Sequence, residues 1–258
     1  MSNVAFGWRG GVVVALALSA VAFVFSLAPI PQDPAYHRFA DSRGLLGIAH
    51  AGDVLSNLAF LLAGTAGLWL SANVRTGAPP VQLLCYRVFF AGVALTAFGS
   101  MYYHLAPDNA RLVWDRLPMA VSFMAFFASV LAELVSARLA RALLGPLVVV
   151  GVASVLYWNA TEQSGVGDLR AYALVQFLPM LLIPLLLVLY PRPRGYLKYI
   201  AALGVCYALS KLLEFADAEI FRMGELVSGH TLKHLFAALA PACLLPWLAR
   251  RDGKEGSR

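Results

Sequence analysis

The sequence carries little charge. Only 13% of its 258 residues are Asp, Glu, Lys or Arg, whereas 60% are hydrophobic. A soluble domain of this length carries about 25% charged residues. The low charge excludes an ordinary soluble domain and indicates a protein that crosses a membrane several times.

Cysteine and polar connections are also scarce. The three cysteines, Cys85, Cys206 and Cys243, lie inside apolar runs without close spacing, which excludes a disulfide framework or a thiolate metal site. The formal net charge of +6 arises from basic residues scattered through short connections. That scatter is typical of membrane topology, so we expect no nucleic-acid partner.

Eight apolar runs are long enough to cross a bilayer, which takes about 20 mostly apolar residues. They lie at residues 9–29, 53–72, 84–105, 113–136, 139–158, 170–190, 195–215 and 229–249. We therefore predict an all-α integral membrane protein with eight transmembrane helices. Residues 1–30 would hold a retained anchor helix, residues 31–249 a seven-helix core, and residues 250–258 a disordered cytoplasmic tail.

The connections between the runs alternate in charge. One set is basic and contains Arg9, Arg75, Arg138, Arg141, Arg192, Arg194, Lys198, Arg250, Arg251, Lys254 and Arg258. In the other set, basic residues are balanced by acidic ones. Because basic connections favour the cytoplasm, we expect a multi-pass protein of the cell membrane with both termini cytoplasmic. His104, Asp115, His230 and His234 would then lie near the opposite, non-cytoplasmic face.

These four residues could form a catalytic metal site. His230 and His234 are four residues apart, so they share one face of a helix. With His104 they would supply three imidazoles, a common ligand set of catalytic zinc. Asp115 could take a proton from water, and Ser100, one turn before His104, could donate a hydrogen bond. The chemistry favours hydrolysis of an amide or ester in a lipid that enters from the bilayer.

Other interpretations remain open at this stage. A histidine near the interface is often a structural, hydrogen-bonded group. The chain could also be a membrane sensor with a structural zinc site, although such sites usually have a fourth protein ligand. A third alternative is an electron-transfer protein with His104 and one other histidine as axial ligands of haem, which would leave Asp115 without a role.

Three segments together resemble the alkaline ceramidase family. They are Gly99-Ser100-x-x-x-His104, Trp114-Asp115-Arg116-Leu117-Pro118-Met119 and Ser228-Gly229-His230-x-x-x-His234. With Asp53, Ser56 and Asn57, the similarity covers residues 41–245 and is closest to bacterial members. The family belongs to a seven-helix membrane hydrolase superfamily that includes the adiponectin receptors.

The resemblance implies specific roles for these residues. His104, His230 and His234 would ligate zinc, Asp115 would assist the attack of zinc-bound water, and Ser100 would help. The activity implied is cleavage of the N-acyl amide bond of a ceramide-like lipid. One region departs from the family pattern: His50 stands where an acidic calcium ligand is expected, which argues against calcium dependence. The oligomeric state is not indicated by the sequence.

Further charges lie inside the fourth, seventh and eighth runs. Lys211 and Glu214 are three residues apart, so we predict an internal ion pair. Lys233 and Arg116 flank the predicted site. They would either attract a lipid phosphate or extend to the membrane interface, and we favour the second interpretation.

Overall fold

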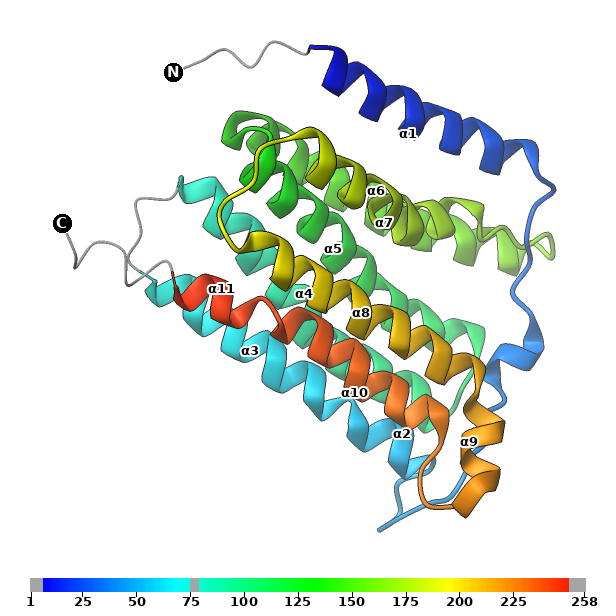
Figure 1. The fold of residues 1–258 in the computed structure, drawn as a ribbon. Helices are drawn as coiled ribbons and strands as arrows, with labels where there is room; N and C mark the ends of the chain where they lie inside the picture. The colour runs from blue at the N-terminus through cyan, green and yellow to red at the C-terminus, as the bar shows by residue number, and fades with distance from the viewer. Residues whose placement is uncertain (1–6, 75–78, 251–258) are drawn as a thin grey trace. The chain divides into compact units, whose positions relative to one another are not determined.

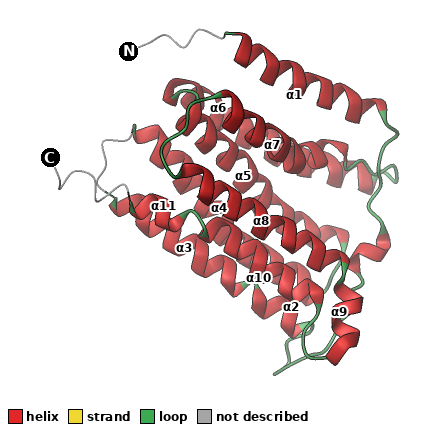
Figure 2. Ribbon diagram, viewed as in Figure 1, coloured by secondary structure: helices red, strands yellow, loops and turns green. Residues whose placement is uncertain are grey.

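The computed structural model describes residues 7–74 and 79–250, and regular structure there is helical (Figure 2). An isolated bridge between Leu45 and Ile48 is the exception in this part of the chain. Of the predicted tail 250–258, residues 251–258 lie outside the described residues. The prediction of an all-α fold is confirmed.

Eight helical segments are long and apolar enough to cross a membrane, as predicted. The largest difference from the predicted edges is in α6, which continues to Gln163 rather than ending at residue 158. The segments are formed by α1 (Trp8–Ser26), α2 (Ala51–Ser56) with α3 (Leu58–Asn73), α4 (Pro80–Leu105), α5 (Asn109–Leu134), α6 (Ala137–Gln163), α7 (Arg170–Leu189), α8 (Tyr196–Phe215), and α10 (Gly229–Ala242) with α11 (Leu245–Ala249). Two short helices, η1 (Pro34–His37) and α9 (Asp217–Gly224), lie in connections.

Two of the eight segments are interrupted. The second breaks at Asn57, whose side-chain amide donates a hydrogen bond to the Asp53 carbonyl oxygen at 2.7 Å and so competes with the backbone. The eighth breaks between α10 and α11, where Pro246 has no N–H to continue the helical ladder. The predicted bounds of these two runs, 53–72 and 229–249, agree with the segments Ala51–Asn73 and Gly229–Ala249 to within two residues, and each segment has one short interruption.

The described chain divides into two compact units, which we treat separately. Unit 1 comprises the described parts of 1–32, 78–89 and 120–194, and unit 2 those of 33–77, 90–119 and 195–258. Because α4 and α5 are long, each contributes one part to unit 1 and the other part to unit 2.

In unit 1, α7 packs against both α1 and α6. Trp158 and Tyr86 are fully buried there. A connection before α7 is tied back to the chain near α1 by a hydrogen bond from the Leu169 N–H to the Ile30 carbonyl oxygen, 2.8 Å long. This unit is largely an apolar helix assembly.

In unit 2, α10 lies against α8 and α3, as Figure 1 shows in orange, yellow and cyan. It also contacts α2 and α9. The start of α10 approaches α8 very closely, because a Cβ atom on Gly229 would lie 2.3 Å from the Leu213 carbonyl oxygen. Glycine at this position therefore allows the first turn of α10, which carries His230, to enter the core of unit 2.

Candidate metal centre

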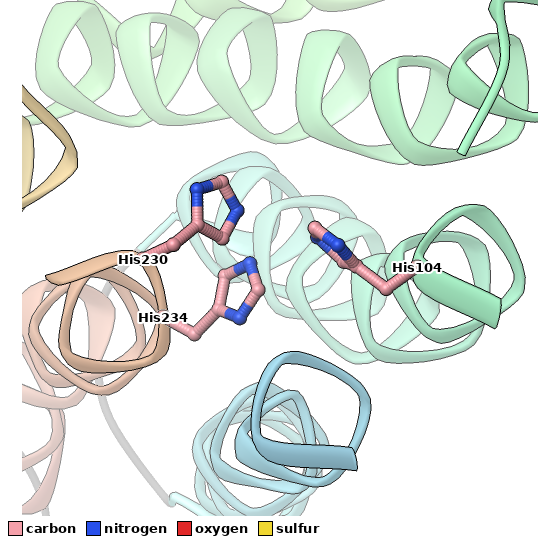
Figure 3. Close-up of side chains that lie close together, drawn as sticks. All are labelled: His104, His230 and His234. Atoms are coloured by element: carbon pink, nitrogen blue, oxygen red, sulfur yellow. The ribbon is translucent and has the colours of Figure 1, made fainter. Parts of the chain in front are cut away.

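Three predicted site residues, His104, His230 and His234, lie together in unit 2. Their potential ligand nitrogens are all within 4.8 Å of one another, and each side chain is at least 96% buried. His104 comes from the last turns of α4, and the other two come from the first two turns of α10 (Figure 3). Among the described residues, this is the group of imidazole, thiol and carboxylate side chains whose geometry could hold a metal ion.

The first turn of α10 is held in place by hydrogen bonds at its end. The Ser228 side chain caps the helix by accepting a hydrogen bond from the Thr231 N–H at 3.0 Å. The His230 N–H donates to Asp217 Oδ1 at 2.8 Å. These contacts satisfy amides that a helix start leaves without partners, and they fix the position of the His230 side chain.

Ser56 orients the ring of His234. Its Oγ lies 2.8 Å from His234 Nδ1 and donates to the Asp53 carbonyl oxygen at 3.1 Å. Because the hydroxyl has one proton, this network assigns the donor role to His234 Nδ1 and leaves a lone pair on Nε2. Metal-binding histidines usually donate their second ring N–H in this way.

His104 supplies a further indication of a metal. Its Nδ1 is buried and has no hydrogen-bond partner. A buried polar nitrogen without a partner is energetically unfavourable, and coordination by a metal ion would remove that deficit. Three neutral imidazoles and an unsatisfied nitrogen therefore fit a divalent cation of the zinc type.

Phe39 covers one side of the three histidines. Its ring centroid is 4.7 Å from that of His104 and 4.4 Å from that of His230. The next residue, Ala40, donates its N–H to Asp217 Oδ2 at 2.9 Å. Asp217 therefore joins the connection after η1 to the start of α10, and the aromatic ring excludes water from this side of the histidines.

Ser100 and Asp115 lie next to one another on α4 and α5. Both are buried, and their side chains are hydrogen-bonded. The helices approach closely here, since a Cβ atom on Gly99 would lie 2.0 Å from the Trp114 carbonyl oxygen. Asp115 is not part of the potential ligand group, which fits a role other than metal ligation.

Lys211, Glu214 and Lys233 form a charged triplet in unit 2. The predicted ion pair is confirmed, with Lys211 Nζ 2.8 Å from Glu214 Oε2. The prediction that Lys233 extends to the membrane interface is wrong: its Nζ lies 2.6 Å from Glu214 Oε1 and 3.4 Å from His230 Nε2. The triplet therefore adjoins the histidines directly.

The two remaining histidines, His37 and His50, lie outside the metal-ligand group. His37 has its ring nitrogens 2.9 Å from Tyr103 Oη and from Asn109 Oδ1. His50 precedes α2 with a positive φ of 46°. In the connection before α2, Asp41 pairs with Arg43 at 2.7 Å. Hydrogen bonds from Arg43 hold the pKa of the Asp41 carboxyl below its usual value.

Sequence reasoning missed the roles of Phe39 and Asp217. A phenylalanine in a polar connection gives no signal of its own. Asp217 was expected to contact the Lys211–Glu214 pair or a polar headgroup, whereas it accepts hydrogen bonds from the Ala40 and His230 N–H groups. Ser56 did have a signal, because it follows Asp53 by about one helical turn at the start of an apolar run.

A comparison of the chain with models of protein families and with curated proteins found no match.

Proposed function

We propose that this protein is a zinc-dependent intramembrane hydrolase that cleaves the N-acyl amide bond of a lipid. The observation that carries the proposal is the buried group of His104, His230 and His234 in a unit that also holds the paired Asp115 and Ser100. The resemblance of these five residues to the alkaline ceramidase pattern supports the same reaction.

The metal would be held by the three imidazoles. A zinc ion in such a set supplies Lewis-acid activation of water and of a carbonyl group. The protein side chains supply proton transfer: Asp115 accepts a proton from the attacking water and returns it to the leaving amine nitrogen. Ser100 orients the carboxylate of Asp115 through their hydrogen bond. The products are a fatty acid and an amine.

Haem binding is disfavoured by the packing of the rings. The centroids of the three imidazoles are 4.8–4.9 Å apart. Rings in mutual contact leave no space for a macrocycle between two axial ligands. A sensor with a structural zinc site would not use the hydrogen-bonded pair of Asp115 and Ser100.

The direct test is hydrolysis by the purified full chain. A panel of N-acyl lipids is incubated with the protein, with and without a zinc chelator, and released fatty acid is measured. We expect release that stops with the chelator and returns with added zinc, and about one zinc per chain by elemental analysis. Zinc without turnover on any lipid would support the sensor instead, and absence of zinc would contradict both.

The charge pattern supports a topology for this reaction. We place both termini in the cytoplasm and the histidines near the non-cytoplasmic face, because the more basic connections favour the cytoplasm. A reporter fused after Arg258 should then give a cytoplasmic signal. An external signal would reverse the assigned orientation.

A further inference from the structure

Glu214 is shared by two ammonium groups. Each of its carboxylate oxygens faces one lysine, with Lys211 Nζ at 2.8 Å and Lys233 Nζ at 2.6 Å. The three side chains are only 15–36% exposed, and both helices that carry them are candidate membrane spans. Lys211 alone would neutralise Glu214, so the second ammonium is not needed for an ion pair.

Three carboxylates balance the three cations in this part of unit 2. The charges of Asp115 and Asp53 also act on Lys233, and the positive charge of Arg116 acts on Asp115. Lys211, Lys233 and Arg116 are therefore matched by Glu214, Asp115 and Asp53. A divalent metal on the histidines would add positive charge, which is unfavourable inside a membrane segment unless an anionic ligand neutralises it.

The position of Lys233 selects it as the contact for such a ligand. It follows His230 by three residues on α10 and therefore projects from a similar face of the helix. Its Nζ is 3.4 Å from His230 Nε2. A group bound beside the three imidazoles would lie within reach of this ammonium, whereas Lys211 lies on the opposite oxygen of Glu214.

We infer that Lys233 is a substrate-binding residue that holds an anionic group, a carboxylate or a phosphate, on the amine part of the N-acyl lipid. Glu214 and Lys211 act as positioning residues, because Glu214 fixes the ammonium and Lys211 shares the carboxylate charge. The inference rests on the proposed function and narrows its substrate class: N-acyl lipids with an anionic amine part should be preferred over neutral ones such as ceramide.

The test compares matched substrates and matched variants of the full chain. The substrates are N-palmitoylglycine, which carries a carboxylate, N-palmitoylphosphoethanolamine, which carries a phosphate, and neutral N-palmitoylethanolamine and ceramide. We expect kcat/KM for one of the two anionic substrates to be about 10- to 100-fold above that for the neutral substrates, which is the gain that a charge-assisted hydrogen bond provides. The preferred substrate then identifies the anion as a carboxylate or a phosphate. Lys233→Met should reduce this ratio to about one, and Lys233→Arg should keep most of it.

Lys198→Met is the matched control. Lys198 lies at the opposite end of α8 from Lys211 and contacts the ring of Tyr199. Its replacement by methionine therefore removes the same charge at a distance from the site. We expect the preference to be unchanged in this variant. An equal loss in Lys198→Met and Lys233→Met would assign the effect to total charge and overturn the contact with Lys233.

A binding measurement separates this inference from the proposed function. Hexadecyloxyacetate and 2-hexadecyloxyethanol have no amide bond and differ in the carboxylate. The chelator-treated wild-type protein should bind the first more tightly by about 10-fold or more, and Lys233→Met, or Lys233→Gln if that variant does not fold, should bind the two equally. Equal binding by the wild type would overturn the inference even if N-acyl lipids are cleaved. If no N-acyl lipid is cleaved but the anion is preferred, the proposed reaction fails and the anion site stands.

Discussion

The two units are both assembled from apolar helices, but they bury charge in different ways. Unit 1 has an open apolar cleft of about 580 Å³, lined by parts of α1, α5, α6 and α7. The buried carboxylate described in this unit, Asp168, lies in a connection and is paired with Arg170 at 2.8 Å. In unit 2, Asp53 and Asp115 are buried within candidate membrane spans, together with the three clustered histidines.

The two units also differ in whether their buried polar groups have hydrogen-bond partners within the protein. The ion pair of Asp168 is complete, since Arg170 and Tyr157 both donate hydrogen bonds to it. In unit 2, His104 Nδ1 and Asp53 Oδ2 are buried without hydrogen-bond partners. Buried polar groups without hydrogen-bond partners are energetically unfavourable inside a membrane protein, and they indicate a site that binds a metal ion or another ligand.

Loss of one imidazole should have the largest effect. A small effect would mean that the unsatisfied polar groups of unit 2 do not mark a metal site. His104→Ala leaves two ligands, so we expect zinc content to fall from about one per chain to near zero and hydrolysis to disappear. Elemental analysis and fatty-acid release measure this. His37→Gln, outside the ligand group, should keep its zinc; full zinc content in His104→Ala would remove that residue from the ligand set.

Asp115→Asn should separate chemistry from metal binding. The amide cannot accept the proton, so we expect turnover to fall by about 10²- to 10⁴-fold while zinc content is unchanged. Activity assays and elemental analysis on the same preparation decide this. Unchanged turnover would show that Asp115 is buried for a structural reason, as Asp168 is.

Ser56→Ala should have an intermediate effect that is specific to metal affinity. The change removes the acceptor of the His234 Nδ1–H and leaves the ring less well oriented, so zinc should bind about 10- to 100-fold more weakly. Competition with a chelator of known affinity measures the change. Ser154→Ala, a buried serine of unit 1 that bonds its own helix at the Gly151 carbonyl oxygen, serves as control and should have no effect on zinc.

Asp168→Asn should have the smallest effect on function. Arg170 would lose its carboxylate partner, so the melting temperature should fall by a few degrees while zinc content and turnover stay the same. The pKa of Asp168 is lowered to about 2 from an ordinary value of 3.8, chiefly by hydrogen bonds from Arg170.

The sign of the pH effect follows from that lowered pKa. Stabilisation by Asp168 is fully present above about pH 4 and is lost as the pH falls towards 2. Thermal unfolding of wild type and Asp168→Asn should therefore differ at neutral pH and converge in this acidic range. A difference that persists at pH 2 would contradict the assigned ion pair.

Much of the fold could be predicted because the bilayer restricts the possibilities. A run of about 20 apolar residues in a membrane must form a helix to satisfy its backbone, and all eight predicted spans are helices. The break at Asn57 could not be predicted in the same way, since it depends on a side chain that competes for one backbone carbonyl. The interruption between α10 and α11 lies next to Pro246, but a proline in a membrane helix does not by itself require a break.

The site was predicted in part for a similar reason. Histidines are rare in apolar helices, so His104, His230 and His234 stood out, and their spacing placed two of them on one face. Lys233 was interpreted wrongly because a lysine at a helix end usually extends to the interface. Its partner, Glu214, belongs to a different helix, and no pattern along the chain shows that the two meet.

By itself, the sequence determined the helical class, the number of membrane spans and the residues that can ligate a metal, because each follows from local composition and spacing. Only the tertiary structure decided which groups surround those residues. Ser56 on His234, Phe39 over His104 and His230, and Lys233 against Glu214 are contacts between segments far apart in the chain. Such contacts depend on close helix packing at positions such as Gly99 and Gly229, where the absence of a side chain sets how near two helices come.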